Sequence, residues 1–147
     1  MLNSMDMSTF EWAKYARVDG KKSFIHAIVD REAHLTIGAH RLIIDASGTA
    51  HLILVVSAPS WHGKGVFEEV RSAILDRFSD YPLIQRFSAA VLARNFPSIY
   101  NYQKLGFRNI GYAKRLYLNP VTSKHDDVCL FEMLPEDWRS LRGDHGK

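Results

Sequence analysis

The sequence has little cysteine and no long apolar run, and both absences narrow what the chain can be. One cysteine among 147 residues excludes an internal disulfide framework and offers no cysteine cluster for a metal. Cys129 stands in the apolar run Val-Cys-Leu-Phe, which favours a buried small side chain over a nucleophile. No apolar run reaches the ~18 residues of a membrane-spanning helix. The first residues lack a basic region followed by an apolar stretch, so we expect no signal peptide and, by default, a cytoplasmic location.

Neither sign of charge dominates the chain. Lysine and arginine number 19, and aspartate and glutamate 16, which gives a formal net charge of +3. The basic residues are scattered rather than gathered in a block, so the pattern suits an anionic cofactor or substrate and argues against a nucleic-acid partner. The sequence also has no internal repeat, low-complexity segment or linker, and residues 1–147 have the length of one domain.

Hydrophobic spacing and turn residues predict the order α-β-β-β-α-β-α-β-β, which is an α/β (α+β) chain with helices packed on a mixed sheet. Ser8 and Thr9 are expected to cap a helix that runs to about Arg17, within an N-terminal helical segment over residues 1–22. Strands are predicted at residues 23–30, 34–45, 51–57, 87–93, 109–118 and 127–134, and helices at 66–78 and 95–106. The core therefore covers residues 23–134, and residues 135–147 are expected to be a C-terminal tail.

The turn Trp61-His62-Gly63-Lys64-Gly65 joins the most apolar strand, expected to be central, to the helix at residues 66–78. Free N–H groups in a first helical turn, with the helix dipole, attract anions such as phosphate. The two glycines let the backbone approach a ligand, and Lys64 and His62 offer further donors. The spacing matches neither a P-loop nor a dinucleotide fingerprint, and an ordinary strand-to-helix turn remains an alternative.

The segment Asn-Phe-Pro-Ser-Ile-Tyr-Asn-Tyr-Gln-Lys-Leu-Gly-Phe, residues 95–107, is the most informative part of the chain. It is typical of a short helix with a polar start at Asn95 and a glycine stop at Gly106. Tyr102 stands in the middle of that helix. Together, this segment and the glycine-bearing turn predict a site that holds a phosphorylated cofactor and carries out acid–base chemistry.

These two segments, in this order and spacing, resemble the Gcn5-related N-acetyltransferase (GNAT) superfamily. The family's cofactor turn, [Gln/Arg]-x-x-Gly-x-[Gly/Ala], corresponds to His62 through Phe67. Its second motif, Asn-x-x-Ala-x-x-x-Tyr-x-x-x-Gly-Phe, is matched at Asn95, Ser98, Tyr102, Gly106 and Phe107, with serine in place of alanine. The resemblance covers residues 23–134 and includes the closing Asp-Val-Cys-Leu-Phe-Glu-Met-Leu as the family's last strand.

The resemblance implies a mostly antiparallel sheet of about six strands, acetyl-CoA as co-substrate and no metal. In this family one strand splays from its neighbour, the pantetheine arm lies in the gap, and backbone N–H groups hold the pyrophosphate. The cofactor residues implied are Val55, Val56 and Ser57 on the strand, His62, Gly63, Lys64, Gly65, Val66 and Phe67 at the turn, and Asn95 on the cofactor arm.

Three departures from the family pattern affect these expectations. His62 replaces the usual glutamine or arginine, which is expected to weaken the pyrophosphate contact without abolishing it. Phe67 replaces a small residue, which is expected either to shift the helix or to narrow the pocket, and a narrow pocket argues for a short acyl chain. The region before the cofactor strand is short for this family. We therefore expect a more open acceptor cleft, or one completed by a partner subunit in a homodimer.

The resemblance makes Tyr102 the general acid that protonates the leaving thiolate. A phenol suits this role because the thiolate is only moderately basic. A packing aromatic on the helix is the alternative for Tyr102, and Tyr100 is the neighbouring rival, although the spacing to Gly106 favours Tyr102.

A base must also take the proton of the attacking amine. His51 stands eleven residues before His62, where several branches of the family place a glutamate, and histidine titrates near neutral pH. A surface histidine at a strand end is the alternative. His26 and His40 are predicted on neighbouring strands, where each faces either the cleft or the solvent. Lys124 and His125 stand in the predicted loop between the last two strands, which either borders the acceptor or is plain surface.

The sequence thus predicts an acetyl-CoA-dependent N-acetyltransferase for an amine of unknown identity. A non-catalytic acyl-CoA-binding module and a small basic nucleic-acid-binding domain remain as alternatives. Turnover that is lost in Tyr102→Phe separates the first alternative from the enzyme, and a failure to bind oligonucleotides at any salt concentration excludes the second.

Overall fold

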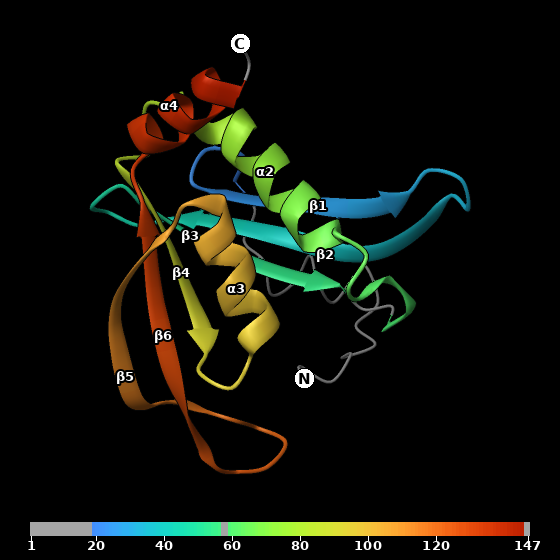
Figure 1. Ribbon diagram of the computed structural model, residues 1–147, viewed down its shortest axis with the longest axis vertical. Coiled ribbons are helices and arrows are strands. Elements are labelled where there is room, and N and C mark those ends of the chain that lie inside the picture. The colour runs from blue at the N-terminus through green and yellow to red at the C-terminus, as the bar shows by residue number, and fades with distance from the viewer. Residues whose placement is uncertain (1–18, 57–58, 146–147) are drawn as a thin grey trace.

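The structure is a computed structural model that describes residues 19–56 and 59–145. The helix expected from Ser8 to Arg17, and Ser57, lie outside the described residues. The elements are β1 (Ser23–Asp30), β2 (Leu35–Ile44), β3 (Thr49–Val56), the short 3-10 helix η1 (Pro59–Trp61), α2 (Val66–Phe78), β4 (Arg86–Leu92), α3 (Phe96–Leu105), β5 (Arg108–Leu118), β6 (His125–Met133) and α4 (Pro135–His145) (Figure 1).

The six strands form one sheet in the order β1-β2-β3-β4-β6-β5. All neighbours are antiparallel except β3 and β4, which run parallel because α2 crosses over between them. This confirms a mixed, mostly antiparallel sheet with the apolar strand β3 near its centre. Each predicted strand is present, with small shifts at its ends.

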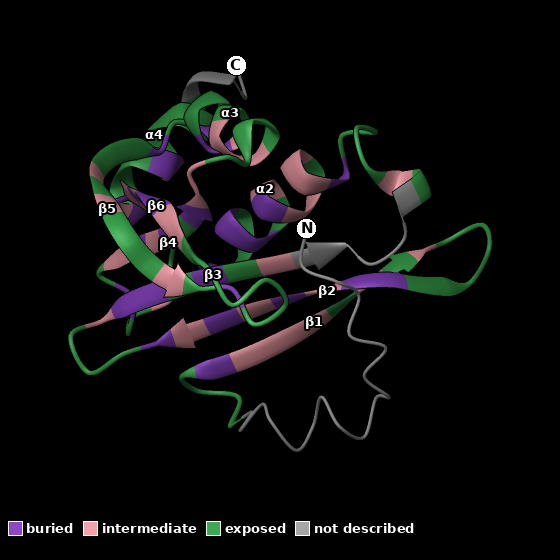
Figure 2. Cartoon of the chain, turned by 90° about the horizontal axis from the view of Figure 1, so that it is seen from below, coloured by how far each residue is buried: buried purple, intermediate pink, exposed green. Residues whose placement is uncertain are grey.

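The three α-helices in the described residues lie on the same face of the sheet (Figure 2). Between the sheet and these helices lies the core, whose fully buried side chains include Leu42, Leu75, Phe87 and Phe131. Burying a side chain of this size contributes about 1.5–3 kcal/mol, so this layer dominates the stability of the fold.

Helix α2 presents the apolar stripe that its spacing predicts. Ile74 and Phe78 are buried in the main core, Val66 is buried in a smaller cluster with Ile37 of β2, and Val70 is half-buried against both. The side chains recur every fourth residue and therefore fall on one side of the helix. That side packs on the sheet, which fixes the direction of α2 across β1 to β3 (Figure 1).

A lone glycine inside a predicted strand, such as Gly38 within residues 34–45, often marks a bulge, and β2 has an irregularity at this place. The pairing with β1 runs from Ser23↔Ile43 to Ile28↔Gly38 and then skips one residue, resuming at Val29↔Thr36. Such a bulge bends the strand and increases its local twist. The strand therefore changes direction at Gly38, next to Ile37, which packs against Val66 at the start of α2.

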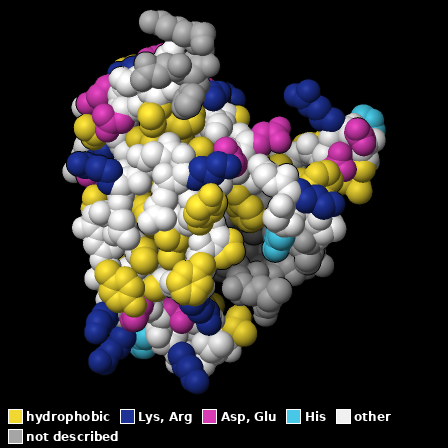
Figure 3. Space-filling view, in the orientation of Figure 1, with side chains coloured by type: hydrophobic (Ala, Val, Ile, Leu, Met, Phe, Trp, Pro, Cys, Tyr) yellow, Lys and Arg dark blue, Asp and Glu magenta, His cyan; other side chains and the backbone are white. Residues whose placement is uncertain are grey.

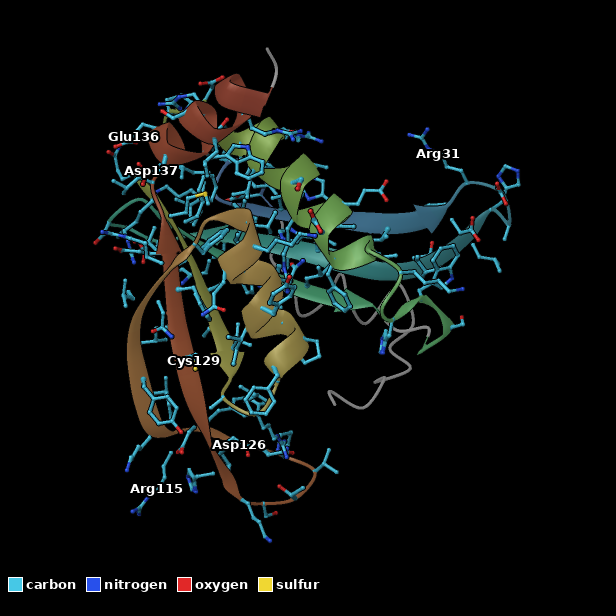
Figure 4. The ribbon with its side chains drawn as sticks, viewed as in Figure 1. Arg31, Arg115, Asp126, Cys129, Glu136 and Asp137 are labelled. Carbon is cyan, nitrogen blue, oxygen red and sulfur yellow. The ribbon has the colours of Figure 1, made fainter. Side chains whose placement is uncertain are left out.

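The expectation of a C-terminal tail over residues 135–147 is wrong, because residues 135–145 form α4. Pro135 opens this helix, and Glu136 and Asp137 follow in its first turn, where carboxylates favour the helix dipole (Figure 4). Trp138 is only 4% exposed, and its indole N–H donates to Asp76 Oδ1 at 2.9 Å. Helix α4 therefore packs on α2 through one buried tryptophan. It lacks the apolar stripe by which hydrophobic spacing in the sequence would predict a helix.

Cys129 is buried on β6, as its apolar neighbours predict (Figure 4). Among the described residues, no helix combines the length and the apolar character needed to span a membrane.

Candidate active site

The two parallel strands at the centre of the sheet separate soon after they begin. Strands β3 and β4 pair only at Thr49↔Arg86, Ala50↔Phe87 and His51↔Ser88, yet β3 continues to Val56 and β4 to Leu92. Figure 1 shows the result, with β1 to β3 running across the view and β4 to β6 running down it. Beyond His51, β3 pairs with β2 alone among the described strands, so its other edge has backbone groups that can bind an extended ligand.

The glycine-bearing turn lies at the far end of that free edge. Gly63 and Gly65 have φ of 77° and 76°, a left-handed backbone that glycine adopts without strain. Gly65 is the N-cap of α2, and no side chain caps the helix there. The N–H groups of the first turn are therefore not satisfied by a capping side chain, which leaves them to a ligand or water.

The charges around this turn have opposing effects on an anion. The Lys64 ammonium lies 5.5 Å from the Trp61 ring centroid, at the exposed side of the turn. Glu68 and Glu69 stand in the first turn of α2, and the Glu68 carboxylate is paired with the Lys104 ammonium at 2.9 Å. The positive potential for a phosphate therefore comes from backbone N–H groups and Lys64, with one of the two carboxylates neutralised.

Phe67 occupies the position where the family has a small residue. It is half-buried, with its ring centroid 6.0 Å from that of His62 and 5.3 Å from the Arg71 guanidinium carbon. The ring therefore lies between the cofactor turn and the contact between α2 and α3.

Tyr102 is 3% exposed and lies inside an aromatic cluster. Its ring is stacked on Phe131 with centroids 5.6 Å apart and meets Phe107 edge-on at 5.0 Å. The Arg71 guanidinium carbon lies 4.0 Å from the centroid of the same ring. Burial raises the pKa of the Tyr102 phenol above its usual value, and the Arg71 charge opposes that rise. The phenol is therefore protonated at neutral pH, as a general acid must be.

The structure distinguishes Tyr102 from its rival. Tyr100 is 67% exposed on the outer side of α3, whereas Tyr102 faces the sheet. Figure 3 shows apolar side chains over α3 and the β5–β6 hairpin, where Phe96, Tyr100 and Tyr112 are all exposed.

Asn95 is the N-cap of α3, and its Oδ1 accepts a hydrogen bond from the Ser98 N–H at 3.3 Å. It is exposed and follows closely after the end of β4, on the open side of the separated strands. The side chain thus has a structural role, and its contact with the cofactor arm stays a prediction.

His51 lies at the last paired position before β3 and β4 separate. It is exposed, on the sheet face opposite the helices, because the adjacent Leu52 is buried in the core. Its Nε2 lies 3.0 Å from Asp45 Oδ2, and that hydrogen bond lowers the pKa of the Asp45 carboxyl. The carboxylate therefore orients the imidazole beside the opening.

The two histidines predicted on neighbouring strands, His26 and His40, both lie on the helix side of the sheet. His40 is fully buried, so the expectation of solvent or cleft is wrong for it, and burial lowers its pKa to about 3. His26 lines a cavity of about 250 Å³ between β1 and α2, with Ile28 and Arg77 among the other lining residues. Both point to the helix-covered face because they pair across the β1–β2 ladder under α2.

Lys124 and His125 are exposed where the β5–β6 loop runs into β6. Asp126 and Arg115 lie in the same end of the hairpin, far from α4 (Figure 4). Asp126 is paired with Arg94 at 3.0 Å, so its carboxylate is already neutralised.

Val55 and Val56 lie on β3, where their backbone pairs with Ala39 and Gly38 on β2. They lie beyond His51, the last residue of β3 that pairs with β4, so their edge toward β4 has no partner on that strand. Val66 opens α2 and is buried.

Sequence reasoning missed Arg71, the buried cation between α2 and α3. It is 4% exposed and follows Val70 in the apolar stripe of α2. A charged residue beside the apolar stripe of a helix is normally exposed to solvent, so the hydrophobic spacing of α2 gave no indication that Arg71 is buried.

The comparison with protein families gives the decisive observation. The family described as "Acetyltransferase (GNAT) domain" matches residues 3–108. The chain belongs to the GNAT acetyltransferase family. It is therefore an N-acetyltransferase, and enzymes of this family use acetyl-CoA. A sequence search of the curated proteins found no match.

Solved structures show the same GNAT fold. Mutant forms of a spermidine/spermine N-acetyltransferase from Vibrio cholerae superpose with a TM-score of 0.75 at 18% identity, covering 89% of this chain and 76% of theirs. A ribosomal-protein-S5-alanine acetyltransferase from Vibrio fischeri gives 0.73 at 23% identity, covering 88% and 68%. A dodecameric form of the Vibrio cholerae spermidine N-acetyltransferase gives 0.70 at 19%, covering 80% and 67%. At these identities the likeness is one of fold.

Proposed function

We propose that this GNAT enzyme transfers an acetyl group directly from acetyl-CoA to an amine, with Tyr102 as the general acid. The observation that carries the proposal is the separation of β3 and β4 beyond His51↔Ser88, with the uncapped α2 N-terminus at the end of the free strand edge. An extended thioester arm fits along such an edge, and its pyrophosphate fits at such a terminus.

The cofactor is assigned to residues along this path. The free edge at Val55 and Val56 binds the pantetheine amides, together with Ser57, the next residue in the sequence, and Asn95 contacts the arm from the other side of the opening. The pyrophosphate lies on the turn, where Gly63, Gly65 and Val66 supply N–H groups and Lys64 supplies charge. His62 and Phe67 border it.

The chemistry assigns one proton to each of two residues. The amine nitrogen attacks the thioester carbonyl carbon, and the C–N bond forms as the C–S bond breaks. The Tyr102 O–H proton passes to the departing sulfur, which leaves as the thiol of coenzyme A. The extra proton of the new amide nitrogen goes to His51, directly or through water, and Asp45 holds the imidazole for that transfer.

The acceptor is an amine, as it is for the two kinds of neighbour named above. One acts on spermidine or spermine and the other on an alanine of a ribosomal protein. In the described part of the β5–β6 hairpin, Asp126 is paired with Arg94, and Asp127 accepts from the Tyr112 hydroxyl at 2.8 Å and the Arg115 N–H. Because these carboxylates are occupied, we favour an amine with a single charge over a polyamine.

A homodimer is the proposed assembly. Strand β5 forms an edge of the sheet, and its Tyr112, Leu116 and Leu118 side chains are each more than half exposed. Light scattering should give twice the 16.8 kDa chain mass, and Leu116→Lys should lower it to one chain.

The test measures acetyl-CoA binding by calorimetry and thiol release against a panel of amines, including spermidine and an alanine-terminated peptide. We expect saturable binding and amine-dependent release of coenzyme A. Binding with no release for any amine would leave the acyl-CoA-binding module as the function. No binding of acetyl-CoA would overturn the site itself.

A further inference from the structure

Arg71 is a buried cation that joins α2 to α3. Its Nη1 donates to Asn101 Oδ1 at 2.5 Å and its Nη2 to Ser98 Oγ at 3.2 Å. Both acceptors lie within the turn of α3 that leads into Tyr102. The guanidinium carbon lies 4.0 Å from the Tyr102 ring centroid, so the charged group covers the face of the tyrosine ring. At the same time its two N–H donors bind side chains of α3. The guanidinium thus fixes where Tyr102 lies relative to α2.

No carboxylate is paired with Arg71 among the residues that the structure describes, and its buried Nε has no hydrogen-bond partner there. An unmatched buried charge destabilises a fold by several kcal/mol, so an arginine at 4% exposure normally has an acidic partner. Packing alone would be served better by a methionine or leucine at this position. With no resting counter-ion among the described residues, the guanidinium fits a charge that forms only during function.

We propose that Arg71 is a positioning residue whose counter-ion is the phenolate that Tyr102 becomes when it protonates the leaving thiolate. The inference rests on the proposed function, because it takes Tyr102 as the acid. In that step the Tyr102 O–H bond breaks, an S–H bond forms, and the electron pair stays on the phenolate oxygen beside the guanidinium. Arg71 keeps its own protons, and water returns a proton to Tyr102 before the next turnover.

Among the described residues, Arg71 is the charged group that affects the pKa of Tyr102. Phe131 on β6 and Phe107 after α3 pack on the ring and do not titrate. The pKa of Tyr102 is raised by burial and lowered by Arg71. His40 on β2 also senses the Arg71 charge, but with a pKa of about 3 it stays neutral through the range of an activity assay.

The decisive variant is Arg71→Met, which keeps the length of the side chain and removes its charge. We expect kcat to fall about 10–100-fold with little change in KM for acetyl-CoA, because the interaction strengthens only as the phenolate forms. The basic limb of the kcat–pH profile should move to higher pH, because loss of a neighbouring cation raises the pKa of an acid. Arg71→Lys should restore much of both, since it restores the charge.

A matched control is Arg77→Met. Arg77 lies on the same helix with its guanidinium carbon 5.5 Å from the Phe78 ring centroid, but it is exposed and away from Tyr102. We expect this variant to leave kcat and the basic limb unchanged. Thermal unfolding of each variant verifies that it is folded.

A double variant tests whether Arg71 acts through Tyr102. In a Tyr102→Phe background, Arg71→Met should lower kcat no further, since the group it serves is gone. A second readout needs no turnover: the phenolate absorbance assigned to Tyr102, taken as the difference from Tyr102→Phe, should appear at higher pH in Arg71→Met.

Equal losses of kcat with and without the Tyr102 hydroxyl, or an unmoved basic limb in an active and folded Arg71→Met enzyme, would overturn the inference and leave Arg71 a packing residue. Failure of the proposed function looks different, because the unmodified enzyme would then release no coenzyme A with any amine.

Discussion

Two regions of the candidate site, the turn before α2 and the middle of the same helix, are built in opposite ways. The turn is exposed, and what it offers a ligand is backbone, held in a left-handed conformation at Gly63 and Gly65. The middle of α2 is buried and contributes side chains. Arg71 lies over the Tyr102 ring, and its charge lowers the pKa of His40. Binding of a cofactor is thus assigned to backbone conformation, and proton transfer to packing.

The difference determines how each region tolerates change. A Cβ added at Gly63 or Gly65 meets no atom within 4 Å, so crowding inside the protein is no obstacle at the turn. At Tyr102 and Arg71 nearly every atom has a neighbour, so a change of shape there alters the fold as well as the chemistry. Conservative substitutions, which keep the volume, are therefore the useful ones in the middle of α2.

The largest effect is expected for Tyr102→Phe, which removes the hydroxyl and keeps the packing on Phe131 and Phe107. Turnover should fall about 10²–10³-fold while the affinity for acetyl-CoA and the melting temperature change little. Steady-state kinetics and thermal unfolding measure both. Tyr100→Phe, an exposed change on the same helix, is the control and should be neutral. A full rate in Tyr102→Phe would remove Tyr102 as the acid.

Gly65→Asp tests the other region. The carboxylate repels the pyrophosphate and the side chain strains a φ of 76°, so the Kd for acetyl-CoA should rise about 10–100-fold in calorimetry. Gly20→Asp places the same side chain at φ 69°, also with no atom within 4 Å, away from the turn. Equal affinity in both variants would show that the turn does not bind the cofactor.

His40 makes the buried region sensitive to acid. Its folded pKa of about 3 lies below the ordinary 6.5, chiefly through burial, with the charges of His26 and Arg71 adding to it. Between these values the unfolded chain binds the proton and the folded one does not, so stability is complete above about pH 6.5 and falls as the pH drops toward 3.

The slope from His40 can reach ~1.4 kcal/mol per pH unit. Denaturant unfolding between pH 7 and 5 should therefore show a smaller loss of stability in His40→Leu than in the unmodified chain. The exposed His125→Gln serves as the control and should keep the full slope. Identical slopes in all three proteins would mean that His40 is not buried as a neutral group.

The smallest effect is expected for His51→Gln, because water can replace an exposed base. The rate should fall severalfold, and the acidic limb of the pH–rate profile should move or disappear. Asp45→Asn should give a weaker change in the same direction, since Asp45 only orients the ring. An unaltered profile in His51→Gln would assign the proton to water or to another group.

Much of the fold could be predicted because its indications are local. Apolar runs and turn residues located all six strands, the stripe from Val66 to Phe78 located α2, and Gly38 indicated the bulge. Helix α4 could not be found in this way. It is held by Trp138 in the core and by Arg142 on Asp76, two contacts with partners far away in the sequence.

The sequence by itself determined the family and the positions of the turn and the Tyr102 helix, because both depend on residues close together in the chain. It could not indicate that Arg71 lies on Tyr102, or that His40 lies beneath α2. Those contacts join α2 to α3 and β2, and they exist only once the strands and helices have packed. Tertiary structure decided them because burial, which sets the cost of a charge and the pKa of a phenol, belongs to the packed chain and not to any one segment.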